Sequence, residues 1–589
     1  MGAIVDVQTF SQDLAHQFAE AGVSDAFLVT GGAIAPFTTA LAEQGRIRMH
    51  YMLTEQSAGI AAESYGYVDG KPALLVVTSG PGVTNSLTPI AAAWTNSSPI
   101  IVISGQSRSS DVKLSYKSRL RQVGNQHLRT DLIVGSLVKR FIEPIKASNA
   151  NEIVSTLLSD ASHGRPGPVW LSLPQDIQRA AKSDERISFT TSEVYGEFKS
   201  SIFKTAVSRL LIESKSPSIL VGAGARRAMP RIIEFAAKIN IPIMTTWPGL
   251  DLIAEKSPLY CGRPGSIPST WAPNLINVNT DFLMIFGARL DLAQVGYNPN
   301  EFAVNASVIR VDIDKEEFSR IPERSNWFNF QGDITNIVDS LPDMTHSLKP
   351  NSYKLWWDKI IAWKKTYPRP IEISQSFSDG VSSYELIEKV SKYFPNGIVV
   401  TGNSGTCIEM VLQSWKTIEG QRVINSCGLG SMGFAISAAI GVALKFDSKE
   451  IVCIESDGSL AMNIQDLKTM KDMKTIFKVI IMDSSGYKSI SLSQKRLGQF
   501  PHGSNVQSAL NLPNSILVAN SLGFQTKEIT DSQEITAALD WLVSQESSSL
   551  LVVKVSEYEE ALPRLISKPN AYGVMETPAM DFLSPIMAN

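Results

Sequence analysis

The chain has 589 residues, of which 43% are hydrophobic and 19% are charged, and its formal net charge is -3. A chain of this length exceeds what one hydrophobic core usually serves, so about three or four domains are expected. Charges of both signs are mixed along the sequence. This excludes the basic face of a nucleic-acid-binding protein and the composition of a disordered chain.

The cysteines and the apolar runs indicate where the protein works. Residues Met1 to Phe10 include Asp6 and lack a charged head followed by an apolar stretch, so no signal peptide is expected. The longest apolar runs are strand-sized, whereas a membrane-spanning helix needs about 20 residues. Four cysteines without C-x-x-C spacing are interpreted as reduced core residues of a cytoplasmic protein: Cys261, Cys407, Cys427 and Cys453.

Short apolar, β-branched runs alternate with helical patterns along most of the chain, which indicates parallel sheets covered by helices. We therefore predict an α/β fold of three consecutive doubly wound parallel-sheet domains. They are an N-terminal domain at 1–180, a central domain at 202–345 and a C-terminal domain at 376–556, followed by a surface tail at 557–589. Polar stretches predict boundaries between them at Ala180–Ser201 and Leu341–Gln375.

Strands are predicted at the apolar runs of each block. In the first block these are Ala26–Thr30, Ala73–Thr78, Ile100–Ser104 and Val169–Leu173. In the second they are Ser218–Val221, Ile243–Thr245, Phe282–Phe286 and Val308–Asp312. In the third they are Gly397–Thr401, Ile451–Glu455, Val479–Asp483 and Leu550–Val555.

Two turns of the third block carry polar groups directly after strands. One reads Ser456-Asp457-Gly458-Ser459 and the next Asp483-Ser484-Ser485-Gly486-Tyr487. The carboxyl ends of parallel strands share one edge, where ligands bind. An aspartate there can hold a hard cation, and a helix N-terminus can receive phosphate. By composition alone, two ordinary strand–helix turns remain the alternative.

The two turns resemble the signature of thiamine-diphosphate-dependent enzymes of the acetohydroxyacid-synthase-like superfamily, usually Gly-Asp-Gly followed by Asn-Asn. The resemblance implies Mg²⁺ ligands and cofactor contacts from Asp457, Gly458, Ser459, Ser484, Gly486 and Tyr487, with Gly486 acting through its carbonyl.

Two departures from the signature concern the metal. Ser456 replaces the first glycine, and Asp483-Ser484 replaces the asparagine pair. A serine hydroxyl is a neutral and shorter ligand, so weaker Mg²⁺ binding is expected unless Asp483 or water substitutes.

The first block is similar to the same superfamily. The segment from Thr54 matches its catalytic-glutamate helix at Glu55, Ala62, Gly66 and Tyr67. The resemblance implies that Glu55 hydrogen-bonds to N1′ of the aminopyrimidine and so promotes removal of the thiazolium C2 proton. Outside this pattern, a surface glutamate on a helix of small residues would be the simpler interpretation.

Other short motifs resemble cofactor-binding loops of the superfamily in the same order. Met432 falls on the residue that props thiamine into its bent shape, with a core-filling methionine as the alternative. The implied cofactor residues are Gly31, Gly32, Ala33, Gly80, Asn85, Asn403, Ser404, Gly405, Gly430 and Met432.

The middle block suggests a second cofactor. Glycine turns and strand-end aspartates fall where FAD-containing members bind flavin, although such residues are common in any α/β domain. The residues are Gly222, Ala223, Gly224, Gly287, Arg289, Asp312 and Asp333.

Arg119–His127 supplies cationic and amide donors suited to a carboxylate or phosphate. Gln126 falls near a substrate-side glutamine of the superfamily. His127 is interpreted as a proton relay or, by preference, as a solvated loop histidine. The resemblance also implies that the cofactor lies between the first block of one subunit and the third block of another, in a homodimer or homotetramer.

The resemblance implies a transferase or lyase that decarboxylates a 2-oxo acid and transfers the two-carbon acyl unit to an acceptor carbonyl. The expected 2-oxo acid is pyruvate. The loop Gly486–Gln494 lacks the tryptophan expected of branched-chain amino-acid synthesis. It looks closer to branched-sugar and O-antigen synthase-like members, whose acceptor is a nucleotide-linked keto sugar. Acetolactate synthase, a simple 2-oxo acid decarboxylase and a non-catalytic cofactor-binding paralogue are the alternatives; retention of Glu55 argues against the last.

Overall fold

The computed structural model describes residues 8–189, 198–344, 346–349, 351–374, 379–395, 397–447 and 450–586. Parts of several sequence predictions lie outside these residues. They are 1–7 of the N-terminus, 190–197 of the first boundary, 345, 350 and 375 of the second, 376–378, 396, 448 and 449 of the third block, and 587–589 of the tail. In the described part of the chain, no helix has the length and apolar character to span a membrane.

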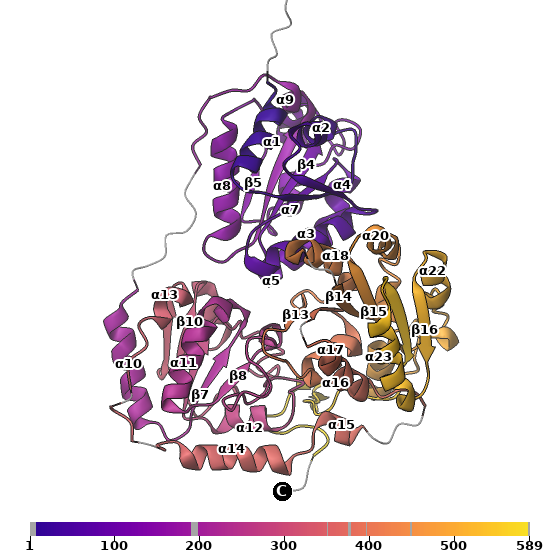
Figure 1. Ribbon diagram of the computed structural model, residues 1–589. Coiled ribbons are helices and arrows are strands. Elements are labelled where there is room, and N and C mark those ends of the chain that lie inside the picture. The colour runs from indigo at the N-terminus through magenta and orange to yellow at the C-terminus, as the bar shows by residue number, and fades with distance from the viewer. Residues whose placement is uncertain are drawn as a thin grey trace, which may run out of the picture.

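The first domain is a parallel sheet in the order β2-β1-β3-β4-β6-β5 (Figure 1). Its strands are β1 Asp25–Leu28, β2 Arg48–Tyr51, β3 Leu74–Val77, β4 Ile100–Gln106, β5 Arg140–Ile142 and β6 Pro168–Pro174. Its helices are α1 Phe10–Glu20, α2 Ala35–Gln44, α3 Glu55–Asp69, α4 Pro81–Asn85, α5 Leu87–Asn96, α6 Ser109–Lys117, α7 Thr130–Val134, α8 Ala150–Ser162 and α9 Gln175–Arg179.

The central domain is a parallel sheet in the order β11-β10-β9-β7-β8. Its strands are β7 Pro217–Val221, β8 Ile243–Thr245, β9 Phe282–Phe286, β10 Ser307–Asp312 and β11 Trp327–Gln331. Its helices are α10 Ser200–Glu213, α11 Met229–Ile239, α12 Ala272–Asn279, α13 Ile334–Val338 and α14 Lys354–Thr366, with 3₁₀ turns η1 Ala223–Ala228, η2 Trp247–Gly249 and η3 Lys315–Arg320.

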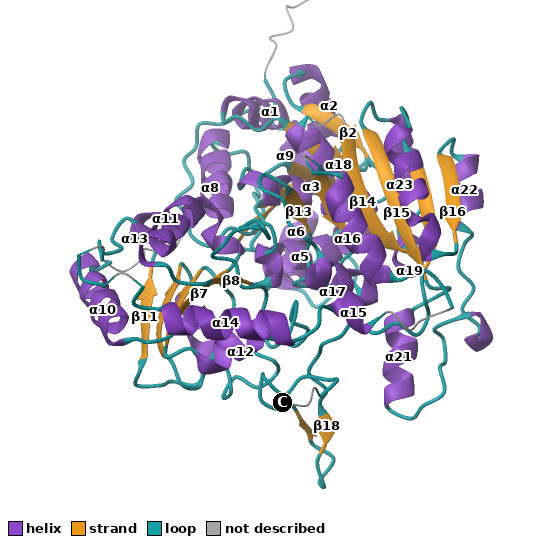
Figure 2. Ribbon diagram, turned by 60° about the horizontal axis from the view of Figure 1, so that its bottom comes forward, coloured by secondary structure: helices purple, strands orange, loops and turns teal. Residues whose placement is uncertain are grey.

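The third domain is a parallel sheet in the order β13-β12-β14-β15-β17-β16, which repeats the strand order of the first. Figure 2 shows β14 and β15 of this sheet side by side. Its strands are β12 Ile398–Thr401, β13 Arg422–Ile424, β14 Glu450–Ser456, β15 Ile476–Asp483, β16 Gln525–Ile529 and β17 Ser549–Lys554. Its helices are α15 Pro370–Ile373, α16 Ser383–Tyr393, α17 Gly405–Ser414, α18 Phe434–Phe446, α19 Asp457–Leu460, α20 Asp466–Asp472, α21 Lys488–Arg496, α22 Ser515–Ser521 and α23 Ile535–Ser544, with 3₁₀ turns η4 Val506–Ser508 and η5 Ser532–Glu534.

Both faces of these sheets are covered. In β14, Ile451 and Cys453 join one apolar cluster, whereas Val452 and Ile454 join another on the opposite face. Strands buried on both sides need continuous apolar runs, which explains why these segments are visible in the sequence. The prediction of three parallel-sheet α/β domains is confirmed.

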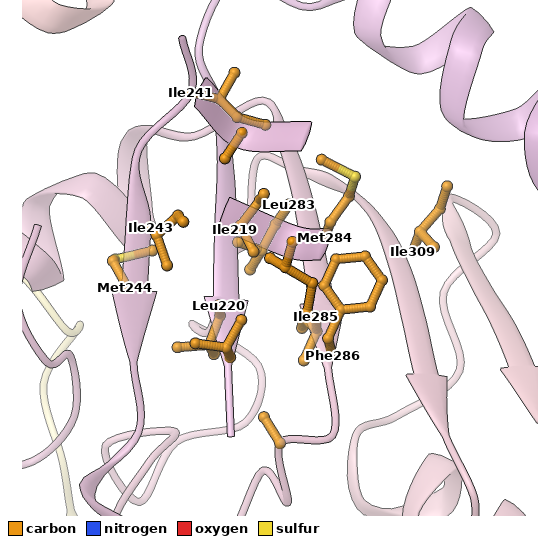
Figure 3. Close-up of a cluster of buried hydrophobic side chains, with 14 of the residues drawn as sticks. Ile219, Leu220, Ile241, Ile243, Met244, Leu283, Met284, Ile285, Phe286 and Ile309 are labelled. Atoms are coloured by element: carbon orange, nitrogen blue, oxygen red, sulfur yellow. The ribbon is translucent and has the colours of Figure 1, made fainter. Parts of the chain in front are cut away.

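Figure 3 shows how the central sheet builds its core from neighbouring strands. Ile219 and Leu220 of β7 lie between Met244 of β8 and Ile285 of β9, and all four side chains are buried. Fully burying one such side chain stabilises the fold by about 1.5–3 kcal/mol. The core therefore fixes the strand register, and with it the positions of the strand-end loops.

The second expected boundary, Leu341–Gln375, contains more structure than a linker. Helix α14 lies within it, and Trp356 and Ile360 of this helix are buried in the central core. The apolar positions of α14 are separated by lysines, which made the segment look polar.

The tail after Ser556 also carries buried residues. Met580 joins the central core, and the Ser266 carbonyl accepts a 2.8 Å hydrogen bond from the Leu565 N–H. A two-stranded ribbon, β18 Lys568–Pro569 with β19 Met575–Glu576, lies near the C-terminal end (Figure 2). The tail thus runs back from the third domain to the central domain.

Candidate active site

Two turns lie side by side at the carboxyl edge of the third sheet, because β14 and β15 are parallel neighbours. The Asp457 side chain is 6% exposed and accepts a 2.8 Å hydrogen bond from the Gly486 N–H. It also lies 3.5 Å from the Ser484 nitrogen, and the Ser484 hydroxyl lies 3.3 Å from the Gly486 carbonyl oxygen. The structure therefore brings together a carboxylate, a hydroxyl and a carbonyl.

These three oxygen groups fit Mg²⁺, which prefers hard oxygen ligands. Burial and the nearby Asp483 raise the pKa of the Asp457 carboxyl above its usual range. A bound cation would favour the ionised form again. Across the described ranges, no group of three or more His, Cys, Asp or Glu side chains could hold a metal. A cation at this seat would therefore depend on one carboxylate and neutral oxygens.

The Asp483 carboxylate is already hydrogen-bonded to other groups of the protein. It accepts hydrogen bonds from the Lys554 ammonium at 2.6 Å and from the Ser485 N–H at 2.9 Å. The substitute ligand considered from the sequence is thus already engaged elsewhere, which leaves Ser484 or water to complete the coordination.

The loop from Gly428 to Gly433 lies next to this seat. The Ser459 hydroxyl accepts a 2.8 Å hydrogen bond from the Gly433 N–H. Gly430 and Gly433 both have positive φ, 70° and 77°, a conformation that favours glycine. Met432 is half buried in this loop and is not among the fully buried core residues, which weighs against the core-filling alternative.

Small residues at the remaining strand-end turns of the third domain would let a ligand come close to the backbone. Ser404 is the N-cap of α17, and Gly405 begins that helix with φ 65°. A β-carbon at position 458 would lie 2.6 Å from the ring of Tyr487. Asn403, Ser404 and Gly405 follow β12, the neighbour of β14, so they share the edge that carries Asp457.

Glu455 is a buried group that the sequence motifs did not single out. It accepts hydrogen bonds from the Ala435 N–H at 3.1 Å and the Ser456 N–H at 3.0 Å. Burial raises its pKa to about 7, and Gly402 provides the room that its carboxyl group needs. The available signal was a glutamate that directly follows the apolar run Ile451–Ile454 and precedes the turn Ser456-Asp457-Gly458.

Glu55 is the first residue of α3, which is N-capped by Thr54. The half-buried Glu55 carboxylate accepts a 3.1 Å hydrogen bond from the Asn85 amide, which joins two of the sequence-predicted residues. A β-carbon at position 80 would lie 2.8 Å from the Gln126 side chain. Gly80, Asn85 and Gln126 therefore gather near the start of α3.

The Gly31-Gly32-Ala33 loop follows β1 at the same edge of the first sheet. A β-carbon at position 31 would lie 2.5 Å from the Thr78 side chain, whereas one at position 32 would meet nothing within 4 Å. The Ala33 carbonyl accepts a 2.7 Å hydrogen bond from the Gln178 amide. Only Gly32 therefore leaves open space for a ligand.

A cavity of about 360 Å³ adjoins the glycine turn of the first domain. Its residues supply one guanidinium, two side-chain amides and a hydroxyl, which suit a carboxylate or phosphate. The lining is formed by Gly80, Pro81, Thr84, Arg121, Gln122, Gln126, His127 and Leu128.

The preference for His127 as a solvated loop histidine is wrong. Its side chain belongs to a residue only 5% exposed, and the Ser107 hydroxyl lies 2.6 Å from its Nδ1. Nε2 is buried without a hydrogen-bond partner among the described residues. Burial lowers the pKa of His127, so the neutral ring is favoured. The polar neighbours of the segment hid this burial from the sequence.

Helix α3 packs along α18, its topological equivalent in the third domain. Ser57, near the start of α3, lies 3.4 Å from the amide of Gln465, two residues after Asn463, whose amide donates to the carbonyl of Gly433 at the start of α18. Asp69, at the end of α3, pairs at 2.9 Å with Lys445 near the end of α18. The helices therefore run in the same direction, with both starts at one end. A single chain already places the start of α3 towards the Gly428–Gly433 loop.

The seven residues considered for flavin line the carboxyl edge of the central sheet. A β-carbon at Gly222 would overlap the Gly287 carbonyl, and Gly224 donates to that same carbonyl at 3.2 Å. Ala223 begins the 3₁₀ turn η1, and Asp333 is the N-cap of α13. The Asp312 carboxylate accepts a 3.0 Å hydrogen bond from the Asp314 N–H. The Arg289 guanidinium donates a hydrogen bond to the Thr95 carbonyl of the first domain. Contacts within the protein thus account for these residues, and the flavin prediction depends on the resemblance alone.

The sequence matches three domain families of thiamine pyrophosphate enzymes. These are the N-terminal TPP binding domain at residues 8–129, the central domain at 205–341 and the C-terminal TPP binding domain at 404–553. The chain belongs to the thiamine-diphosphate-dependent, acetohydroxyacid-synthase-like superfamily. The helix that begins at Glu55 and the turn that carries Asp457 lie in the N-terminal and C-terminal TPP binding domains, respectively.

Relatives cover nearly the whole chain. The acetolactate synthase isozyme 1 large subunit of Escherichia coli is 27% identical over 94% of this chain and 95% of its own length. Isozyme 2 of the same organism is 28% identical over 94% and 96%. The acetolactate synthase large subunit of Cyanidium caldarium is 29% identical over 92% of each chain.

Proposed function

We propose that this protein is a carboligase that decarboxylates a 2-oxo acid and transfers the resulting two-carbon acyl unit to an acceptor carbonyl. The 2-oxo acid that we propose is pyruvate. The C1–C2 bond of pyruvate breaks and CO₂ leaves. The former C2 then bonds to the acceptor carbonyl carbon, and the acceptor oxygen takes up a proton. Thiamine diphosphate, when bound, supplies the nucleophilic carbon and the electron sink for these steps.

The observation that carries this proposal is the retention of both halves of the site in one chain. Asp457, Ser484 and the Gly486 carbonyl would hold Mg²⁺ against the cofactor diphosphate. Glu55, oriented by Asn85, would hold a proton at N1′ of the pyrimidine ring. A non-catalytic paralogue would have no need for Glu55, so the enzyme is favoured over that alternative.

The cavity beside Gly80 supports the choice of an acidic substrate. Arg121 and the amides of Gln122 and Gln126 line it and can bind a 2-oxo acid carboxylate or the phosphates of a larger acceptor. For the acceptor we propose a nucleotide-linked keto sugar, because the loop Gly486–Gln494 contains no tryptophan. Acetolactate synthesis is the second candidate, favoured by relatives of that name.

Product analysis tests this proposal. The purified protein with Mg²⁺ and thiamine diphosphate is given pyruvate alone, with 2-oxobutyrate, or with a nucleoside-diphosphate keto sugar, and products are identified by mass spectrometry. An acetyl-branched sugar is expected. Acetohydroxyacids in every mixture would favour a synthase, free acetaldehyde would favour a simple decarboxylase, and absence of CO₂ release despite bound cofactor would contradict catalysis.

We also propose a homodimer or homotetramer in the cytoplasm. Apolar side chains are exposed around the site, with Tyr51 at 60%, Leu53 at 55%, Met462 at 48% and Leu429 at 41%. Such a group of side chains is typical of a surface that another molecule covers. Light scattering with and without thiamine diphosphate tests the assembly; a monomer at working concentration would contradict it.

A further inference from the structure

A second glutamate of α3, Glu63, is buried two helical turns after Glu55. Its residue is 1% exposed, and its Oε1 accepts hydrogen bonds from the Asn96 amide at 2.8 Å and the Ser426 hydroxyl at 2.9 Å. Oε2 is buried and has no hydrogen-bond partner within the described ranges. Burial raises the pKa of Glu63 to about 7. Burying a carboxyl group with one unbonded oxygen costs folding free energy. The hydrogen bond from Ser426 connects this group of the first domain to the third domain.

Ser426 extends the connection to the expected diphosphate turn. Its N–H donates a 2.7 Å hydrogen bond to Oδ1 of Asn403. Because Oδ1 is used in this way, the orientation of the amide is fixed and Nδ2 is left as a donor. Nδ2 of Asn403 is buried without a partner among the described residues. A buried N–H donor without a partner is costly unless a ligand completes its bonding.

The same serine begins the loop that carries Gly430 and Met432. Asn96 also donates to the Ser426 hydroxyl, and Arg289 of the central domain donates to the neighbouring Thr95 carbonyl. A β-carbon at Gly428 would lie 2.8 Å from the Asn96 side chain and 3.1 Å from that of Arg289. All three domains therefore meet where this loop leaves β13.

We propose that Glu63 is a positioning residue, which acts through Ser426 to aim the Asn403 amide at the diphosphate of thiamine diphosphate. An N–H donor directed at an anionic oxygen makes one of the stronger hydrogen bonds in proteins. The link also fixes the start of the Gly428–Gly433 loop to the helix that carries Glu55. The inference depends on the proposed function, because it requires this site to bind the cofactor.

A titration of thiamine diphosphate with Mg²⁺ into the full-length protein, followed by calorimetry, tests the link. Glu63→Ala and Asn403→Ala should each weaken binding about tenfold, as loss of a supporting partner typically does. If Glu63 acts through Asn403, the double variant should also lose about tenfold, not about a hundredfold. Ser426→Ala should behave like Glu63→Ala, whereas Glu63→Gln, which keeps a carbonyl oxygen acceptor, should bind close to wild type.

A buried carboxylate of the same domain provides the matched control. Asp160 on α8 is buried and pairs with Arg140, on the face opposite α3. Asp160→Asn should leave the cofactor affinity unchanged, even if it lowers the unfolding temperature of the cofactor-free protein. The same pattern in Glu63→Ala, lower stability with unchanged affinity, would overturn the inference, as would additive losses in the double variant.

Two further outcomes distinguish failure of the positioning role from misfolding and from failure of the proposed function. If Glu63→Ala does not fold, Ser426→Ala decides: wild-type affinity in this variant overturns the inference, and a tenfold loss supports it. If the wild-type protein itself does not bind thiamine diphosphate, the proposed function fails, and the positioning role fails with it. Normal wild-type binding together with normal binding by Glu63→Ala contradicts only the positioning role.

Discussion

Substitutions of Asp457 and of Ser484 should affect Mg²⁺ binding differently, because Asp457 offers a charged oxygen ligand and Ser484 a neutral one. Two oxygens that are adjacent in an Mg²⁺ octahedron lie about 2.9 Å apart, given Mg–O distances of about 2.0–2.1 Å. The Ser484 hydroxyl and the Gly486 carbonyl oxygen are 3.3 Å apart, so a shift of about 0.4 Å would let both bind one ion. The shorter serine therefore fits better than the sequence indicated, and its weakness is the low partial charge of a hydroxyl.

We expect Asp457→Ala to abolish retention of Mg²⁺ and thiamine diphosphate, because Asp457 supplies the charge. Ser484→Ala should weaken apparent Mg²⁺ affinity by about tenfold, a loss comparable to that of a supporting partner, and Ser484→Asn should strengthen it by less than tenfold. Magnesium titrations at saturating cofactor, by calorimetry and by activity, measure all three. Equal affinity of wild type and Ser484→Asn would show that the hydroxyl, or a water, serves as well as an amide. Undiminished binding by Asp457→Ala would refute the seat altogether.

Three further predictions concern the pocket, the core and the flavin. His127→Ala should raise the KM for the 2-oxo acid about tenfold, the effect of one lost hydrogen bond, while the exposed control His163→Ala should not; equal KM values would remove His127 from substrate binding. Leu220→Ala should destabilise the central domain by about 2–5 kcal/mol in denaturant, whereas the exposed control Leu292→Ala should change stability by less than about 0.5 kcal/mol. If the central domain binds FAD, the purified protein is yellow and releases flavin on denaturation; a colourless protein whose melting is unaffected by added FAD contradicts this.

The strands that the sequence revealed and those it concealed differ in burial. Predicted and observed bounds agree at β8 and β9 and differ by a few residues at the other ten predicted strands. In the three large sheets the missed strands β2, β5, β11, β13 and β16 all lie at sheet edges. An edge strand is covered less completely, so it keeps polar residues, as in Gln525–Ile529, and lacks the continuous apolar run of a central strand.

The site divides along a similar line. Loop motifs with glycine or strand-end polar residues, such as Asp457 and Gly80, were recognisable because backbone geometry and ligand chemistry restrict them. Glu63 and Glu455 were not recognised, because neither belongs to a loop motif. Each is bonded by a residue from a distant segment, Asn96 and Ser426 for Glu63 and Ala435 for Glu455. Their roles depend on tertiary contacts, such as that between Glu63 and Ser426, which no local pattern encodes.

The exchange of the thiamine C2 proton tests most directly that this chain builds a working site around Glu55. Wild-type protein with Mg²⁺ and thiamine diphosphate, followed by hydrogen–deuterium exchange in NMR, should exchange this proton rapidly. Glu55→Gln should bind the cofactor with similar affinity and slow the exchange by about 10²–10⁴, the usual contribution of a positioned acid–base group. Unchanged exchange in Glu55→Gln, with cofactor bound in both proteins, would contradict the assignment of Glu55 and the mechanism that depends on it.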